Sequence, residues 1–74
     1  MKEKIKYLIK RTFGLSDISD EISTSSCEKW DSLNHLNLIV EIEAEFNVSI
    51  EPEDIAEMRS LSDIEKVLNK LLNH

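Results

Sequence analysis

The chain combines stretches that have helical hydrophobic spacing with one long stretch that has none. In the first stretch, apolar residues recur three and four positions apart, as on one face of a helix. These residues are Ile5, Leu8, Ile9 and Phe13. Gly14 follows at once, and glycine readily adopts the left-handed conformation that ends many helices. The pattern predicts a first helix over residues 2–13.

Residues 15–30 lose this periodicity and are rich in Ser, Asp and Thr, which indicates a long loop. Leu15, Ile18 and Ile22 can anchor the loop to a core, and a short turn is expected at residues 20–22. Connections of this length within a compact domain are uncommon and are usually functional. We therefore expect an ordered loop.

Asp31 begins the next helical stretch, because aspartate is a favoured N-cap and residues 32–47 contain no Gly or Pro. Pro52 then suits the first turn of a short third helix that carries Ile55 and Met58. The apolar residues of the second helix that are expected to face the core are Leu36, Ile39, Ile42 and Phe46.

The last helical stretch has two candidate N-caps, Ser60 and Ser62, each with an acidic residue three positions later. A chain of 74 residues is too short for two domains, so we expect a single domain over residues 1–74. The predicted fold class is all-α, a small bundle of three main helices plus one short helix with a long first loop. The expected buried stripe of the last helix is Ile64, Val67, Leu68, Leu71 and Leu72.

The net charge of −6 is distributed unevenly along the chain. Residues 1–11 carry five basic side chains and one acidic side chain, whereas the rest of the chain is strongly acidic. An acidic body repels phosphate backbones, and residues 32–47 contain no Lys or Arg that could read a DNA groove. We therefore expect no nucleic-acid partner and favour proteins with cationic surfaces. The basic face of the first helix is expected to be solvated.

Other candidate chemistry is sparse. Cys27 is the single cysteine, so we expect a bystander thiol and a reducing, cytoplasmic environment. No signal-peptide pattern, membrane-length apolar run, zinc-ligand spacing or calcium-loop pattern is found. His35 lies three residues after Ser32, but a catalytic serine needs a base that a third group orients. We expect His35 to be solvated or to contact a group attached to Ser32.

The segment Trp30-Asp31-Ser32-Leu33 resembles the Asp-Ser-Leu attachment motif of acyl carrier proteins. The resemblance covers nearly the whole chain, including its length, its acidity, the long loop and the acidic run at residues 41–46. It implies that a phosphopantetheinyl transferase esterifies Ser32 with 4′-phosphopantetheine from coenzyme A. The chain would then hold acyl groups as thioesters and would not be an enzyme. The cofactor site is expected to consist of Ser32 and its two neighbours, Asp31 and Leu33. The resemblance implies that Asp31 also contacts the transferase, and Leu33 is expected to have a structural role.

Two further surfaces are implied by the resemblance. Side chains of the second and third helices are implied to meet basic docking patches of acyl-loading and acyl-transferring enzymes, namely Asn37, Val40, Glu41, Glu45, Asp54 and Glu57. Residues between these helices are implied to line a cavity for the acyl chain, namely Ile39, Ile42, Ile55, Met58 and Leu61. A carrier must expose Ser32, which favours a monomer.

The chain departs from housekeeping fatty-acid carriers at several positions. Asn34, Asn37 and Ala44 stand where such carriers often have acids, and Trp30 stands where they often have a small residue. In this respect the chain is similar to specialised stand-alone bacterial carriers, and Trp30 is expected to cover the top of the core. An aminoacyl, D-alanyl or peptidyl carrier would share the fold and Ser32. An unmodified helical interaction adaptor would share the fold alone, so these alternatives stay open.

Overall fold

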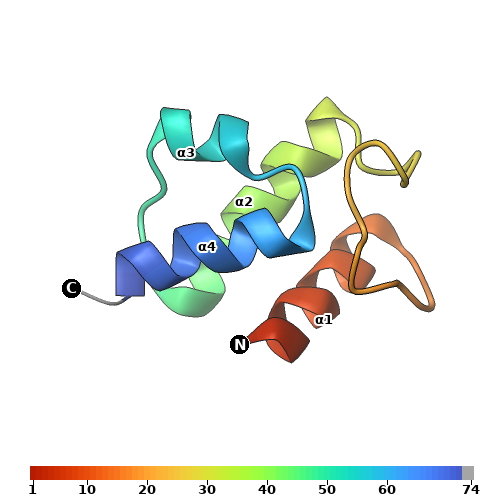
Figure 1. The fold of residues 1–74 in the computed structure, drawn as a ribbon, viewed down its shortest axis with the longest axis horizontal. Coiled ribbons are helices and arrows are strands. Elements are labelled where there is room, and N and C mark those ends of the chain that lie inside the picture. The colour runs from red at the N-terminus through yellow and green to blue at the C-terminus, as the bar shows by residue number, and fades with distance from the viewer. Residues whose placement is uncertain (73–74) are drawn as a thin grey trace.

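The computed structural model describes residues 1–72 and consists of four helices joined by loops (Figure 1). The helices are α1 (Lys2–Phe13), α2 (Ser32–Phe46), α3 (Pro52–Glu57) and α4 (Leu61–Leu72). The predicted all-α class, with three main helices and one short one, is confirmed. None of the helices within residues 1–72 has the length and apolar character needed to cross a bilayer.

Local signals in the sequence set the helix boundaries. Gly14 ends α1 in the left-handed conformation at φ 70°, and its N–H donates to the carbonyl of Lys10. Asn47 ends α2 at φ 55°, one residue before the predicted end, because Asn tolerates this conformation better than most residues. Ser60 is the N-cap at the start of α4, where its hydroxyl accepts a hydrogen bond from the N–H of Asp63 at 3.1 Å.

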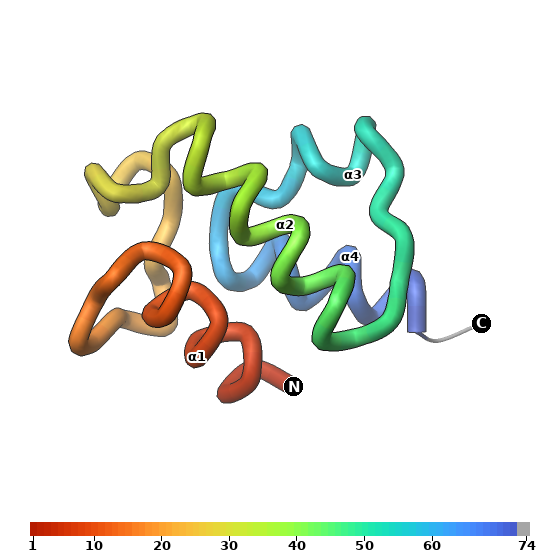
Figure 2. The backbone as a smooth tube through the Cα atoms, turned by 180° about the vertical axis from the view of Figure 1, so that it is seen from behind, coloured from red at the N-terminus to blue at the C-terminus, as the bar shows by residue number. Residues whose placement is uncertain are grey.

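The core lies where α1 packs against α2 and α4, and α3 connects the far end of α2 to α4 (Figure 2). Two predictions about its composition were wrong. Leu36 was expected to be buried but is 56% exposed, and Leu38 is fully buried in its place. Leu72 is also exposed. The buried apolar residues are Ile5, Leu8, Ile9, Phe13, Ile22, Trp30, Leu38, Ile39, Ile42, Ile50, Met58, Leu61, Ile64, Val67 and Leu68.

The long first loop is ordered, as predicted, because main-chain hydrogen bonds attach its middle to the start of α4. The N–H of Thr24 donates to the carbonyl of Arg59 at 2.9 Å, and the N–H of Leu61 donates to the carbonyl of Ile22 at 3.1 Å. The predicted turn is present as well, with the N–H of Ile22 donating to Ser19 at 3.2 Å. The middle of the loop is therefore held against the start of α4.

Candidate functional site

Ser32 is the first residue of α2, and its side chain is exposed. The turn before it is fixed by three hydrogen bonds. Asp31 caps the helix as predicted, because its Oδ1 accepts from the N–H of Asn34 at 2.8 Å and its carbonyl accepts from His35 at 2.8 Å. The side-chain amide of Asn34 donates to the carbonyl of Lys29, also at 2.8 Å. Ser32 is thus presented at a rigid helix N-terminus, where free N–H groups and the helix dipole favour an anion.

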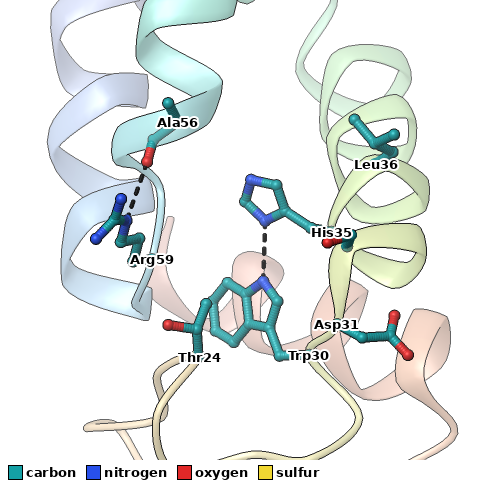
Figure 3. A pocket seen from close by; sticks show the side chains of 8 residues that line it. Thr24, Trp30, Asp31, His35, Leu36, Ala56 and Arg59 are labelled. Carbon is teal, nitrogen blue, oxygen red and sulfur yellow. Dashed lines mark hydrogen bonds between the residues drawn. The ribbon is translucent and has the colours of Figure 1, made fainter.

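An open cavity of about 640 Å³ lies beside Ser32. Figure 3 shows His35 and Leu36 on the α2 side of this cavity and Ala56 and Arg59 on the side of α3. Arg59 is the one basic side chain among the lining residues, and its Nε donates to the carbonyl of Ala56 at 3.2 Å. The lining residues are Thr24, Trp30, Asp31, Ser32, His35, Leu36, Ala56 and Arg59.

His35 connects the loop, α2 and α3 through both of its ring nitrogens. Nδ1 accepts a hydrogen bond from Trp30 Nε1 at 2.9 Å, and Nε2 lies 2.8 Å from the carbonyl oxygen of Ile55 (Figure 3). An indole N–H only donates and a carbonyl only accepts, so His35 is neutral here and carries its hydrogen on Nε2. His35 is therefore held between Trp30 and Ile55 and is not simply solvated, while its contact with a group on Ser32, whose cavity it lines, stays a prediction. Both nitrogens are engaged, and neither is left to act as a base toward Ser32.

Trp30 covers the top of the core, as its apolar ring suggested. It is 4% exposed, and its ring lies 5.5 Å from that of Phe13 in a tilted arrangement. The Trp30 and His35 rings are stacked with their centroids 6.3 Å apart. The residue before the Asp-Ser-Leu motif is therefore a structural support for the start of α2.

The acids expected to dock partner enzymes fall into three environments. Glu57 is exposed, as that role requires. On α2, Glu41 forms an ion pair with Arg11 of α1, and Glu45 forms one with Lys4 at 3.1 Å. These two carboxylates are therefore already paired within the chain.

Asp54 is a correction to the predicted docking set. Its carboxylate is buried, at 7% exposure, and accepts a hydrogen bond from Lys70 Nζ at 2.7 Å. This bond is the main reason that the pKa of Lys70 lies above its ordinary value. Asp54 thus ties α3 to α4 and is not available as a docking acid.

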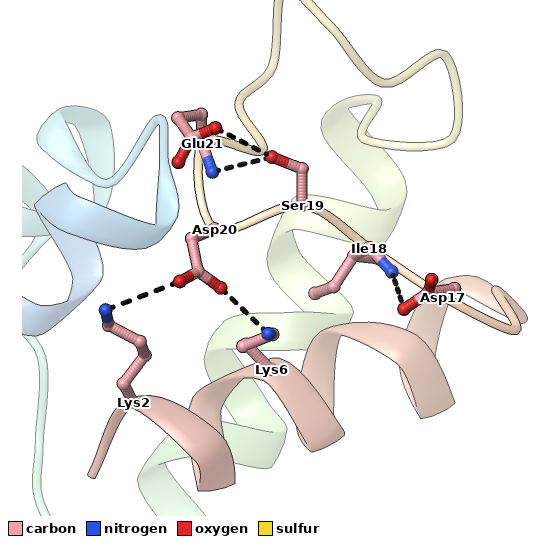
Figure 4. A network of polar contacts seen from close by, with 7 residues as sticks. All are labelled: Lys2, Lys6, Asp17, Ile18, Ser19, Asp20 and Glu21. Atoms are coloured by element: carbon pink, nitrogen blue, oxygen red, sulfur yellow. Dashed lines mark hydrogen bonds and ion pairs between the residues drawn. The ribbon is translucent and has the colours of Figure 1, made fainter.

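Two other basic residues of α1 also form ion pairs within the chain. Lys2 and Lys6 both pair with Asp20 of the loop, at 3.5 Å and 2.8 Å (Figure 4). The hydrogen bond from Lys6 is the main cause that holds the pKa of Asp20 below its ordinary value and raises the pKa of Lys6. The basic face of α1 was expected to be solvated, and Lys2, Lys4 and Arg11 are exposed. The same face also neutralises acids of its own chain.

The exposed face of α2 is apolar next to Ser32. Leu33 is 70% exposed, although it was expected to be structural, and Val40 is 62% exposed. Asn37 is exposed as well. A helical pattern through Leu33, Leu36 and Val40 was present in the sequence, and it could have been read as a second apolar stripe.

The residues predicted to line an acyl cavity are mostly tightly packed. Ile39, Ile42, Met58 and Leu61 are at most 4% exposed, and Ile55 is partly buried against the core. They belong to the hydrophobic core or pack against it. None of them lines the cavity beside Ser32, so that cavity is distinct from the predicted one.

The site is suited to a phosphopantetheine group. Attachment needs an exposed hydroxyl, space for an extended arm and surroundings that tolerate a phosphodiester anion. Ser32 supplies the hydroxyl at a helix N-terminus, and the adjoining cavity carries the cationic side chain of Arg59. Residues 1–72 contain no cluster of three or more His, Cys, Asp or Glu side chains placed to hold a metal ion.

Comparison with known proteins agrees with this chemistry. The family model described as phosphopantetheine attachment site matches residues 3–68. The fold is similar to the solution structure of a holo acyl carrier protein from Geobacter metallireducens, with a TM-score of 0.85 and 23% identity over 96% of this chain and 84% of that chain. Family members carry phosphopantetheine as a prosthetic group and are carriers, not catalysts. Because the family model matches residues 3–68, the chain belongs to the phosphopantetheine attachment site family of carriers.

Proposed function

We propose that Ser32 bears the 4′-phosphopantetheine arm and that the chain carries acyl groups on it as thioesters to partner enzymes. The observation that carries this proposal is the exposed Ser32 hydroxyl at the rim of an open cavity, at the N-terminus of α2. When bound, the arm supplies the thiol that forms the thioester. The proposed partners are a phosphopantetheinyl transferase and the enzymes that load and transfer acyl groups. We propose that the carrier is a monomer, forms one domain over residues 1–74 and works in the cytoplasm.

Residues of the chain fix the position of Ser32 and stabilise the negative charge of the phosphodiester that modification adds. Modification forms a bond from Ser32 Oγ to phosphorus, with loss of the hydroxyl proton and release of adenosine 3′,5′-bisphosphate from coenzyme A. Asp31 holds the first turn of α2, so that Ser32 keeps a constant position for the transferase. The helix dipole and the charge of Arg59 favour the resulting anion.

The test is intact-mass measurement after incubation with coenzyme A, Mg²⁺ and a broad-specificity phosphopantetheinyl transferase. Ser32→Ala is compared with Ser49→Ala, a matched change at another exposed serine. We expect wild type and Ser49→Ala to gain one phosphopantetheine and Ser32→Ala to gain none. Modification of Ser32→Ala, or no modification of wild type that circular dichroism shows to be folded, would overturn the proposal and favour an unmodified adaptor.

The acyl cargo is tested separately from the attachment site. The modified protein is offered octanoate with an acyl-activating ligase, and D-alanine with an adenylating enzyme. We expect loading with octanoate. Loading with D-alanine alone would replace the acyl proposal with an aminoacyl carrier, while the role of Ser32 would stand.

We also propose that the interior between α2 and α3 opens to take the acyl chain. The support is its composition: branched aliphatic residues and a flexible Met58 repack more readily than stacked aromatic rings. Octanoyl and unloaded forms are compared by methyl NMR. We expect shifts at Ile55, Met58 and Leu61, and identical spectra at these residues would refute the proposal.

A further inference from the structure

We propose that His35 selects cargo by the length of the acyl chain, because its hydrogen bond to α3 closes the interior toward the cavity beside Ser32. The bond joins Nε2 of His35 to the carbonyl oxygen of Ile55 at 2.8 Å and is called the gate bond below. The inference rests on the proposed function of Ser32 and deepens it. It assigns a residue that keeps short acyl groups outside the core.

The cavity beside Ser32 and the interior between α2 and α3 are separate spaces, and His35 lies at their boundary. His35 and Ala56 line the cavity, whereas Met58 and Leu61 do not line it and are at most 1% exposed. Figure 3 shows the imidazole of His35 projecting from α2 into the space between α2 and α3. Its partner Ile55 directly precedes the lining residue Ala56. The direct route from the cavity to Met58 and Leu61 therefore crosses the gate bond.

The imidazole is held in this position from its other side as well. Nδ1 of His35 accepts a hydrogen bond from Trp30 Nε1 at 2.9 Å, and the two rings are stacked. Trp30 is buried and packs against Phe13, so it does not follow the imidazole outward. Moving His35 aside therefore breaks two hydrogen bonds, and the unloaded chain keeps the interior closed.

Opposing free energies make the gate bond sensitive to chain length. Opening it leaves the N–H of His35 and the carbonyl of Ile55 unpaired next to apolar residues, which is unfavourable. Burying an acyl chain is favourable in proportion to its apolar area. An acetyl group offers a single methyl, whereas an octanoyl group offers a long methylene chain. Short groups therefore stay in the cavity, whose lining includes the polar side chains of Thr24, Asp31 and Arg59.

The test compares two variants that differ in one hydrogen-bond donor. His35→Gln keeps an N–H at the reach of Nε2, His35→Leu has none, and both lose the acceptor of Trp30 Nε1. A broad-specificity transferase loads each protein from butyryl-coenzyme A, and methyl NMR signals of Met58 and Leu61 report entry of the chain. We expect the equilibrium constant for entry to rise about fivefold in His35→Leu and to stay within about twofold of wild type in His35→Gln.

Wild type gives a second measurement that does not depend on the folding of a variant. The Nε2–H signal of His35 is followed by proton–nitrogen NMR at about pH 8, where free imidazole is uncharged. We expect the acetyl form to keep the signal of the unloaded protein. The octanoyl form should show a shifted Nε2–H signal together with shifted methyl signals of Met58 and Leu61.

The outcomes separate the gate from the attachment site. Shifted methyl signals with an unchanged Nε2–H signal, or equal butyryl entry in His35→Leu and His35→Gln, would overturn the gate while leaving Ser32 as the attachment site. No methyl shift in any octanoyl-loaded protein would refute the gate together with the proposed opening of the interior. No mass gain of folded wild type would instead refute the proposed function, and the gate with it.

Discussion

Replacing His35 with phenylalanine tests the connection between the loop, α2 and α3. The change keeps an aromatic ring and removes both nitrogens, so that Trp30 Nε1 loses its acceptor at 2.9 Å and the carbonyl of Ile55 loses its partner at 2.8 Å. Trp30 is 4% exposed, and its stranded N–H therefore has little access to water. A stranded buried donor costs about 1–3 kcal/mol, and the second bond contributes about 0.5–1.5 kcal/mol. We expect His35→Phe to lower the free energy of unfolding by about 2–4 kcal/mol.

The assay is urea unfolding at neutral pH, followed by far-UV circular dichroism. Wild type, His35→Phe, Trp30→Phe and the double variant form a cycle that separates the hydrogen bond from loss of packing. With phenylalanine at both positions no hydrogen-bond donor is left unpaired. His35→Phe should therefore cost at least about 1 kcal/mol less in the Trp30→Phe background than in wild type. A cost of His35→Phe below about 0.5 kcal/mol, or a coupling energy near zero, would refute the reasoning.

Three further predictions concern the cap, the core and pH. Asp31→Ala removes the acceptor that caps α2 and should cost about 1 kcal/mol, seen as a Tm lower by about 4–8 °C; an unchanged Tm would contradict the capping role. Met58→Ala empties a fully buried position and should cost about 2–5 kcal/mol, close to the about 3–5 kcal/mol that a core of this size supplies, so its helical circular dichroism should be largely lost. Asp20 has a depressed pKa in the folded chain, so its contribution is present at neutral pH and is lost as pH falls through that pKa. Asp20→Asn should therefore lower the urea midpoint at pH 7, and its difference from wild type should shrink below about pH 4; a difference that does not change with pH would contradict the ion pairs with lysine.

The helices could be predicted from sequence because their boundaries depend on local chemistry. Gly14 and Asp31 act within one turn of their own positions, through backbone conformation and a side-chain cap. The family could be recognised for the same reason, since the Asp-Ser-Leu segment on which the resemblance rests is contiguous. These features do not depend on which distant segments pack together.

The wrong predictions concern residues whose burial or contacts depend on a segment that is distant in the chain. Periodicity could not tell which apolar side of α2 faces inward, because Leu36 and Leu38 belong to two different stripes of the same helix. Asp54 is buried and its carboxylate pairs with Lys70 of α4, sixteen residues away in the chain. His35 meets the carbonyl of Ile55 across a separation of twenty residues. No local spacing encodes such pairings.

The attachment of the long loop to α4 has a consequence for the order of folding. The hydrogen bonds from Thr24 to Arg59 and from Leu61 to Ile22 join segments that are far apart in the chain. Contacts of such separation cost more loop-closure entropy than local helical turns do, so they tend to form after those turns. During synthesis, a nascent chain that ends before α4 therefore already contains Ser32 but lacks the fixed loop beside it. The loop beside the proposed attachment residue Ser32 therefore gains its bonding partners on α4 only after residue 61 has been added.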